Sequence, residues 1–283
     1  MVIAMTLQEL RRHLRNLFIE HNIESPEADS GLLLMHKFGL TKTELLLDNR
    51  EVAPEVLAAV EALAQRRIQG EPVRYLVGVA PFMDLEFYVN PSTLIPRPDT
   101  EVLVEAVLAR IDTQTPCRLW DIGCGSGCIG ITLAHEREHL SVTELDISQE
   151  ALDTAKRTAL RYGLAERIHF VNHNILKGMP PLPPPDMIVS NPPYIPTAEI
   201  DHLQKEVRMF EPKAALDGGT DGLIFYRHIS KHAPLPTGGL LAFEIGYDQG
   251  ESVPALMEEQ GYTQVTLLKD LSGNPRVVLG YHK

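Results

Sequence analysis

Residues 121–127 read DIGCGSG and stand between a short apolar run and a helical pattern. Glycines at alternate positions let the backbone turn tightly after a strand and let a ligand approach without side-chain clash. Residues 125–130 (GSGCIG) also fit the dinucleotide pattern GxGxxG. Asp146 follows about 20 residues on, where a carboxylate holds a ribose in nucleotide-binding folds. A plain tight turn, with Asp146 capping the next helix, is the alternative; both features together favour a nucleotide-type cofactor.

The chain from Arg118 onward alternates short apolar runs with helical patterns. Helices between the early strands imply right-handed crossovers and a doubly wound, mostly parallel sheet. Only residues 271–275 separate the last two runs, which suits an antiparallel pair at the sheet edge. The fold class is therefore α/β, with seven strands predicted at 118–122, 141–146, 168–172, 187–190, 240–245, 263–269 and 276–281.

The N-terminal part reads as helices with short connections. Residues 6–9 and 41–44 are capping-box patterns, and Pro26 follows a serine as a typical first helical residue. Another helical run opens at Pro54 and ends before Gly70. These signals predict a small helical domain.

Between the two parts, residues 82–94 alternate enough for a β-hairpin, and a helix is expected from about Thr100 to Arg110. The predicted boundaries are a helical domain at 1–78, a β-hairpin linker at 79–100 and an α/β domain at 101–283.

The net charge and the spacing of the cysteines restrict the kinds of partner and metal that the protein is expected to bind. The 283 residues carry a formal net charge of −12, with 26 basic against 38 acidic side chains, so phosphate-rich partners are repelled. No stretch resembles a signal peptide or reaches the ~20 apolar residues that span a bilayer. Cys117, Cys124 and Cys128 match no zinc spacing and are interpreted as reduced, small hydrophobic residues. We therefore expect a cytoplasmic protein with a protein or small-molecule partner, no metal, no membrane and no nucleic acid directly.

Residues 189–196 (VSNPPYIP) end the predicted fourth strand. Proline cannot donate to a sheet, so a proline-stopped strand with a packed tyrosine is the plain alternative. The proline pair also leaves the carbonyls of Asn191 and Pro192 rigidly aimed. Together with the Asn191 side-chain oxygen they suit a planar NH₂ group, and Tyr194 offers a flat face for stacking. Such acceptors would turn the nitrogen lone pair toward an electrophilic methyl group, with no strong base required.

Several of these stretches resemble known families. An NAD or an S-adenosylmethionine (SAM) enzyme would each place a carboxylate at Asp146, but DIGCGSG resembles motif I of class I SAM-dependent methyltransferases. Residues 191–194 (NPPY) match motif IV of methyltransferases that modify adenine N6, cytosine N4 or amide nitrogen. The chain as a whole resembles the bacterial peptide chain release factor glutamine N5-methyltransferases, the PrmC/HemK family, at residues 71–78, 94–101, 211–223, 243–249 and 269–276.

The resemblance implies methyl transfer from SAM, leaving S-adenosyl-L-homocysteine, to the glutamine of the Gly-Gly-Gln motif in class I release factors. This reaction modulates translation termination. The implied architecture is a seven-stranded Rossmann-like methyltransferase domain, with the helical domain helping to grip the release factor. A monomer is expected.

The resemblance assigns the roles of the family's site residues to the positions of this chain that match its motifs. Asp146 would hold the ribose hydroxyls. Asn174 stands where the family usually has an acid near the adenine and can still accept from the adenine amine, and Ile175 stands where an aromatic can occur. The implied cofactor-binding residues are Gly123, Cys124, Gly125, Ser126, Gly127, Asp146, Asn174, Ile175 and Asn191. The implied substrate-binding residues are Asn191, Pro192, Pro193 and Tyr194, of which Asn191, Pro192 and Tyr194 are catalytic.

A few residues outside these motifs are open to two interpretations. Arg97, Thr100 and Glu101 lie either near the methionine end of the cofactor or only at the hairpin–helix junction. Trp120 is expected in the core, and His173 in a loop or facing solvent rather than as a base.

Three other functions are kept as alternatives. A DNA or RNA amino-methyltransferase shares the NPPY motif but does not suit the acidic balance. A non-catalytic SAM-binding or release-factor-binding protein has slight support from Asn174. An NAD oxidoreductase fits the glycine pattern alone.

Overall fold

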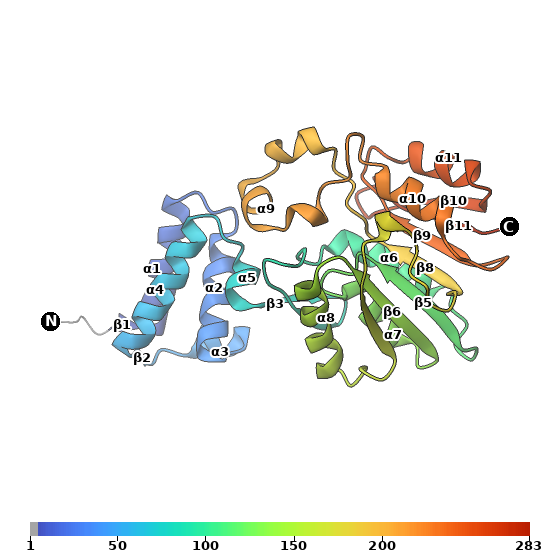
Figure 1. Cartoon of the computed structure of the whole chain (residues 1–283). Coiled ribbons are helices and arrows are strands. Elements are labelled where there is room, and N and C mark those ends of the chain that lie inside the picture. Colours follow the sequence, from blue (N-terminus) through green and yellow to red (C-terminus); the bar gives the residue numbers. More distant parts are fainter. Residues whose placement is uncertain (1–4) are drawn as a thin grey trace. The chain divides into compact units, whose positions relative to one another are not determined.

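The computed structural model describes residues 5–283, which fall into two compact units (Figure 1). The smaller unit contains the described residues up to Gly78 together with residues 204–210. The larger unit contains residues 79–203 and 211–283. The β-hairpin at its N-terminal end is therefore part of the larger unit. None of the helices between residues 5 and 283 combines the length and apolarity that a bilayer crossing requires.

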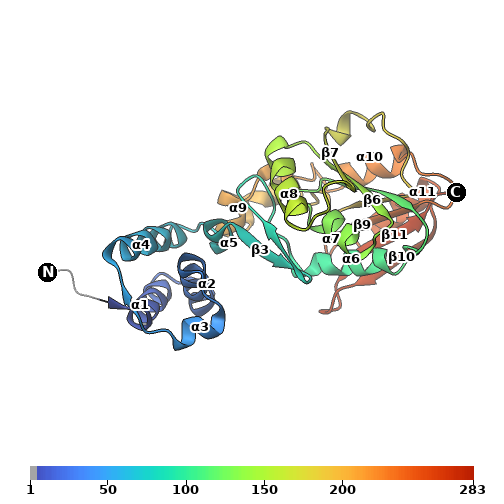
Figure 2. The ribbon, with the colours of Figure 1, turned by 90° about the horizontal axis from the view of Figure 1, so that it is seen from below.

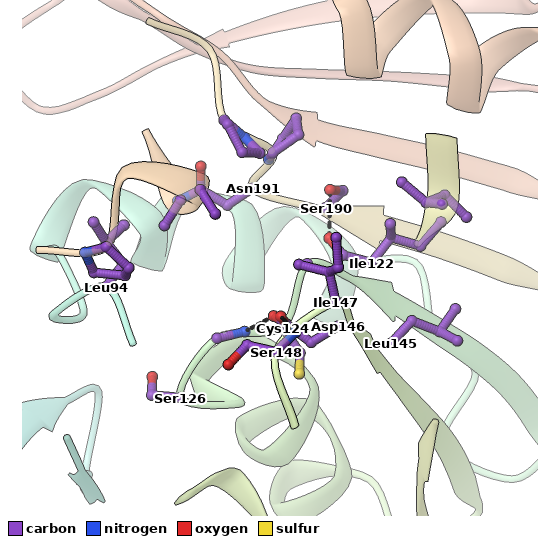
Figure 3. Close-up of a pocket in the computed structure, with 18 of the residues that line it drawn as sticks. Leu94, Ile122, Cys124, Ser126, Leu145, Asp146, Ile147, Ser148, Ser190 and Asn191 are labelled. Carbon is purple, nitrogen blue, oxygen red and sulfur yellow. Dashed lines mark hydrogen bonds between the residues drawn. The ribbon is translucent and has the colours of Figure 1, made fainter. Parts of the chain in front are cut away.

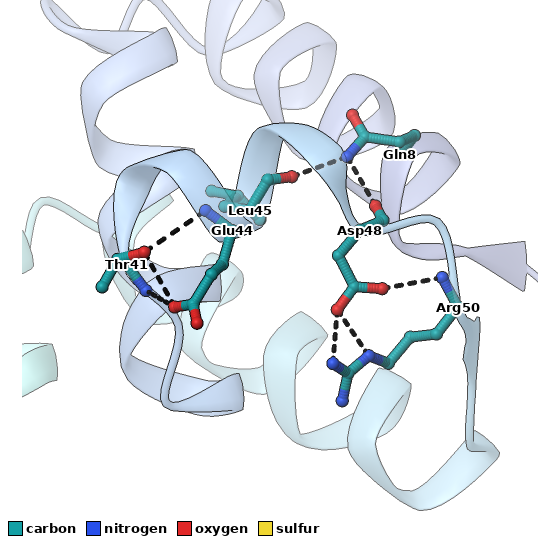
Figure 4. Close-up of polar contacts among 6 residues, drawn as sticks. All are labelled: Gln8, Thr41, Glu44, Leu45, Asp48 and Arg50. Carbon is teal, nitrogen blue, oxygen red and sulfur yellow. Dashed lines mark hydrogen bonds and ion pairs between the residues drawn. The ribbon is translucent and has the colours of Figure 1, made fainter.

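The smaller unit is a set of helices held by local caps. Thr6 and Thr41 both form the predicted capping boxes, with Glu9 and Glu44. Figure 4 shows the Thr41 cap and, beside it, the Gln8 amide donating to the carbonyls of Leu45 and Asp48 at 2.6 and 2.7 Å. The apolar face of the first helix is buried at Leu7, Leu10, Leu14 and Phe18. Its elements are β1 Met5–Thr6, α1 Leu7–Glu20, α2 Pro26–Phe38, α3 Lys42–Leu47, β2 Glu51–Val52, α4 Pro54–Ile68 and α5 Val73–Val77.

The buried Arg67 binds a distant segment to this unit through ion pairs. The Arg67 guanidinium, only 3% exposed, donates from Nε to Asp29 Oδ2 at 2.6 Å and from Nη2 to Glu206 Oε1 at 2.5 Å. Glu206 lies on α9, Lys205–Phe210, far along the chain from the helices it joins. The Arg67–Asp29 pair is buried on both sides, and removing one of its partners costs on the order of 3–5 kcal/mol. The Glu206 side chain is 39% exposed, so its ion pair contributes less. This pairing explains why the helical unit includes residues beyond the predicted boundary at 78.

The larger unit is built on one seven-stranded sheet, seen from two sides in Figures 1 and 2. The strand order is β10-β11-β9-β8-β5-β6-β7, with β11 antiparallel to both neighbours and the other pairs parallel. The predicted strands match within a residue at each end, and the antiparallel pair lies at the sheet edge as expected. The strands are β5 Cys117–Ile122, β6 Leu140–Asp146, β7 Ile168–Asn172, β8 Met187–Ser190, β9 Leu240–Glu244, β10 Thr263–Lys269 and β11 Pro275–Tyr281.

Helices cover both faces of the sheet because alternate strand residues point to opposite faces. Leu119 packs into the cluster under α6, α7 and α8, whereas the next residue, Trp120, packs into the cluster under α10 and α11. Trp120 is thus in the core, as predicted. The covering helices are α6 Glu101–Leu108, α7 Cys128–Glu136, α8 Gln149–Arg161, α10 Ile224–His232 and α11 Ser252–Glu259.

The hairpin lies earlier than its predicted span of 82–94. Its strands are β3 Val79–Phe82 and β4 Leu85–Tyr88. The chain then leaves the extended conformation because the Asn90 side chain accepts from the backbone N–H of Ser92 at 2.9 Å, which closes a turn. Short 3₁₀ helices complete the unit at Pro98–Thr100, Ile175–Lys177, Thr197–His202 and Lys213–Ala215.

Candidate active site

A cavity of about 510 Å³ opens at the carboxyl ends of β5, β6 and β8 (Figure 3). Ligands of open α/β sheets bind at this edge, beside the point where the strand order reverses, here between β5 and its neighbours β6 and β8. Most of the residues predicted for the site line this cavity: Gly123, Cys124, Gly125, Ser126, Asp146, Asn174, Ile175, Asn191, Pro192 and Pro193. Gly127 and Tyr194 do not belong to its lining.

The glycine turn presents bare backbone to the cavity. Gly123 and Gly125 have φ of 74° and 55°, a conformation that other L-residues rarely adopt. A Cβ on Gly123 would meet nothing within 4 Å, so its open side lies toward the cavity. Gly127 has a different role, because a Cβ there would come within 2.7 Å of the Ile131 side chain. Gly127 therefore permits close packing at the start of α7.

Cys124 is a packing residue of this turn rather than a reactive thiol. Its side chain is buried, and burial together with nearby carboxyls raises the pKa of the thiol well above its usual range. Cys124 and Cys128 are buried free thiols, as predicted from sequence, while Cys117 is half-buried.

Asp146 organises the turn from the end of β6. Its Oδ2 accepts from the backbone N–H of Gly125 at 2.9 Å, and its Oδ1 accepts from Ser148 at 2.8 Å. Burial raises the pKa of the Asp146 carboxyl, and these backbone hydrogen bonds act in the opposite direction. The N-cap of α8 is Ser148, which accepts from the N–H of Ala151, so Asp146 is not the helix cap. Each Asp146 oxygen retains acceptor capacity toward the cavity.

The segment after β7 supplies another wall of the cavity. Asn174 accepts from the backbone N–H of Leu176 at 3.0 Å and caps the short 3₁₀ helix, while Ile175 is buried beside it. His173 also lines the cavity, with its Nε2 at 2.7 Å from the carbonyl oxygen of Gly178. This contact engages the ring nitrogen with the backbone of its own loop.

The NPPY segment lies opposite the glycine turn, directly after β8. The side-chain nitrogen of Asn191 donates to the Thr100 hydroxyl at 3.3 Å. Thr100 therefore takes part in the site, and at the N-cap position of α6 its side chain makes no capping hydrogen bond. Arg97 lines the cavity and forms an ion pair with Glu211, whereas Glu101 accepts from the backbone N–H of Met83 at the hairpin junction.

Tyr194 faces the protein interior. Its half-buried ring packs against the core cluster that also contains Trp120, and burial raises the pKa of its phenol to about 12. Its backbone carbonyl accepts from Gln249 Nε2 at 3.2 Å.

Glycines let neighbouring loops hold this segment closely. A Cβ on Gly222 would lie 2.3 Å from the Tyr194 carbonyl oxygen, and one on Gly218 would lie 2.7 Å from the Pro193 carbonyl oxygen. Gln249, only 6% exposed, donates to the carbonyls of both Tyr194 and Gly222. The backbone of the NPPY segment is therefore fixed on several sides.

Sequence reasoning missed Gln249 and two buried acids, Glu144 and Glu244. The acids could have been found: Glu244 ends an apolar run, and Glu144 takes the place of an apolar residue on the alternation of Leu140 and Val142, where a charge is costly. Gln249 gives no such signal, since a glutamine after a strand is ordinary in a loop.

The strand order, the glycine turn after β5 and the acid at the end of β6 together define a class I methyltransferase fold. Residues 9–78 match the family described as the PrmC N-terminal domain, and residues 98–228 match the methyltransferase small domain. A crystal structure of a methyltransferase from Pyrococcus furiosus superposes with a TM-score of 0.51 at 17% identity, covering 77% of this chain and 96% of that one.

Curated relatives give a narrower assignment. The release factor glutamine methyltransferase of Neisseria gonorrhoeae is 42% identical, over 90% of this chain and 93% of its own. The enzyme of the same name from Moorella thermoacetica is 40% identical over 99% of both chains. The chain belongs to the release factor glutamine methyltransferase family.

Proposed function

We propose that this enzyme transfers a methyl group from SAM to the side-chain amide nitrogen of the glutamine in the Gly-Gly-Gln motif of class I release factors. Family membership over nearly the whole chain supports this activity. The observation that carries it is Asn191 in the cavity wall with one end of its side-chain amide bound to Thr100, because the other end is then available to a substrate amide.

The cavity suits SAM in size and chemistry. Its volume of about 510 Å³ is ordinary for a small-molecule site. The bare backbone at Gly123 and Gly125 would accept the amino-acid end of the cofactor, and the Asp146 oxygens would accept the ribose hydroxyls. Asn174 and Ile175 would flank the adenine. When bound, SAM supplies a methyl group on a positively charged sulfur.

Asn191 and Pro192 would prepare the substrate nitrogen. An amide nitrogen is a poor nucleophile because its lone pair is delocalised into the carbonyl. Accepting both of its hydrogens, at Asn191 Oδ1 and the Pro192 carbonyl, directs electron density to nitrogen and aims the lone pair at the methyl group. The reaction forms a nitrogen–carbon bond, breaks the methyl–sulfur bond and releases one amide proton to solvent. Tyr194 is proposed to shape the pocket around the amide.

The helical unit is proposed to bind the release factor, since it contributes no lining residue to the cavity among residues 5–283. A net charge of −12 favours a protein partner over a phosphate backbone. A cytoplasmic monomer fits this role.

Incubation with methyl-labelled SAM and a class I release factor tests the proposal. We expect label in the release factor, and mass analysis of the Gly-Gly-Gln peptide should locate one methyl group on the glutamine. The matched control is the same factor with the glutamine changed to alanine, which should remain unlabelled. Undiminished label in that control, or label in DNA or RNA but not in protein, would contradict the proposed substrate.

A further inference from the structure

Glu244 is a buried acid at the carboxyl end of β9, where all five strand residues are buried. Ser190 pairs with Phe243 in the parallel register of β8 and β9, so the residues that follow them, Asn191 just after β8 and Glu244 at the end of β9, are neighbours. The Glu244 side chain is 2% exposed. Burying a carboxylate costs free energy unless polar partners compensate it, so this acid needs an explanation at its position.

The partners of Glu244 come from the active site. Burial is the main influence and raises the pKa of its carboxyl to about 7, while hydrogen bonds with Thr100 and Asn191 and the nearby Arg276 act in the opposite direction. Its Oε2 has no hydrogen-bond partner among the described residues. The carboxyl is thus incompletely compensated, and its interactions are directed at the residue that faces the substrate.

A neighbouring group selects one orientation of the Asn191 side-chain amide only if it accepts hydrogen bonds without donating them. Turning the amide by 180° exchanges its oxygen and nitrogen, and a nitrogen toward the cavity would oppose the NH₂ group of the substrate. The Thr100 hydroxyl at 3.3 Å cannot decide between the two, because a hydroxyl both donates and accepts. An ionised carboxylate accepts only, so Glu244 favours the orientation with the nitrogen turned toward it.

We propose that Glu244 is a positioning residue for the reaction: it holds the Asn191 nitrogen away from the cavity and so presents Oδ1 to the substrate amide. This inference rests on the proposed methyl transfer at Asn191. Glu244 itself does not line the cavity, so it acts through Asn191.

The ionisation of Glu244 gives this role a pH dependence. When protonated, the carboxyl can donate as well as accept and no longer selects one amide orientation, so kcat should rise with pH through an ionisation near 7. The charged and titratable groups around it are Arg276 on β11, Asp99 before α6, Tyr194 after β8, Cys128 on α7 and Tyr226 on α10. Arg276 is shared with Asp99 and Asp270 through ion pairs of 3.3 and 3.2 Å. Burial keeps Tyr194 and Cys128 protonated well above neutral pH.

The test compares wild type with Glu244→Gln, which has nearly the same shape and removes a buried charge. Its amide both donates and accepts, so it loses the selection of orientation. We expect kcat to fall about 10- to 100-fold, less than the roughly 10²- to 10³-fold cost of deleting a preorganised polar group. The dissociation constant of SAM should stay within about twofold, since Glu244 lies outside the cavity lining. The ionisation near pH 7 should disappear from the pH profile of kcat.

Tyr226→Phe is the matched control, because the Tyr226 hydroxyl donates to the Glu244 backbone carbonyl at 2.9 Å and is equally buried. It should keep the kcat and pH profile of wild type. Three outcomes would overturn the positioning role. One is an equal loss of kcat in Tyr226→Phe, and another is an unchanged kcat in Glu244→Gln. The third is a wild-type kcat that does not change between pH 6 and 8. An inactive wild type would instead refute the proposed function, so the two failures are distinguishable.

Discussion

Asp146 and Asn191 are each held on one side by the protein and present acceptors on the other. Both Asp146 oxygens accept backbone N–H groups, which fixes the carboxylate without using all of its acceptor capacity. Asn191 is bound to Thr100 at one end of its side-chain amide, which leaves the other end for the substrate. The two residues lie at the ends of different strands, β6 and β8, so their proposed roles in cofactor binding and in turnover are separable.

Alanine substitutions at these two positions should have opposite kinetic signatures. Asp146→Ala should weaken SAM binding at least about tenfold, because hydrogen bonds to a charged group contribute about 1.5–3 kcal/mol each. Asn191→Ala should lower kcat about 10²- to 10³-fold with SAM affinity within about twofold of wild type. Calorimetric titration of SAM and initial rates at saturating SAM separate these effects. Equal losses of affinity and kcat in both variants would count against the assigned roles.

At the scale of elements, β5 and β6 are joined by a pair of buried carboxyls. Asp121 and Glu144 are direct partners in the parallel register, and both are fully buried. Asp121 Oδ2 accepts from the N–H of Gly130 at the start of α7. A Cβ on Gly130 would lie 2.4 Å from Glu144 Oε1, so this glycine makes room for the acid.

A proton retained on the pair lowers the cost of burying two carboxyls side by side. Asp121 Oδ1 and both Glu144 oxygens have no hydrogen-bond partner in the described part of the chain, so the two buried carboxyls are not fully compensated when ionised. Burial raises the pKa of Asp121 to about 7 and that of Glu144 well above its usual range. The pair therefore keeps a proton at neutral pH that an unfolded chain loses near pH 4.

The protein should become less stable as pH rises from about 5 to 8. A carboxyl whose pKa is higher in the folded than in the unfolded protein contributes stability that is fully present below about pH 4 and is lost as pH rises through 7. The free energy of unfolding then falls by up to about 1.4 kcal/mol per pH unit for one proton. Glu144→Gln should reduce this slope, because its amide does not ionise. Urea denaturation at several pH values measures it.

Glu138→Gln serves as the control for that measurement, since Glu138 is an exposed acid just before β6. It should leave the slope unchanged. A Glu144→Gln slope equal to wild type would show that the buried pair does not bind the extra proton.

The elements differ in how far the sequence predicts them. The sequence predicts the strands of the sheet to within one residue. A segment such as 187–190 is mostly apolar, and the two prolines that follow it end the strand. The capping boxes at Thr6 and Thr41 are likewise predicted from the local sequence alone. Residues 204–210 belong to the helical unit, where Glu206 pairs with Arg67, and no local sequence pattern indicates a contact between such distant positions. The interactions of Glu244 and Gln249 were likewise not predicted, because they follow from strand register and loop packing.

At the scale of the whole molecule, the chain separates chemistry from the proposed recognition of the partner. Every residue that lines the described cavity belongs to the larger unit. The helical unit matches a family domain of its own over residues 9–78, and none of its described residues lines the cavity. A glutamine side chain is common to most proteins, so selectivity for one glutamine requires contacts beyond the reacting amide.

A short peptide that contains the Gly-Gly-Gln motif should therefore be a much poorer substrate than the intact release factor. Contacts with the helical unit would raise the effective concentration of the glutamine at the site, so their loss should lower kcat/KM by about 10²-fold or more. The loss should fall mainly on KM, because Asn191 and Pro192 meet the same amide in both substrates. Steady-state kinetics at saturating SAM measure it, with equal SAM affinity in both reactions as the control. A kcat/KM for the peptide equal to that for the intact factor would mean that the helical unit adds nothing to recognition.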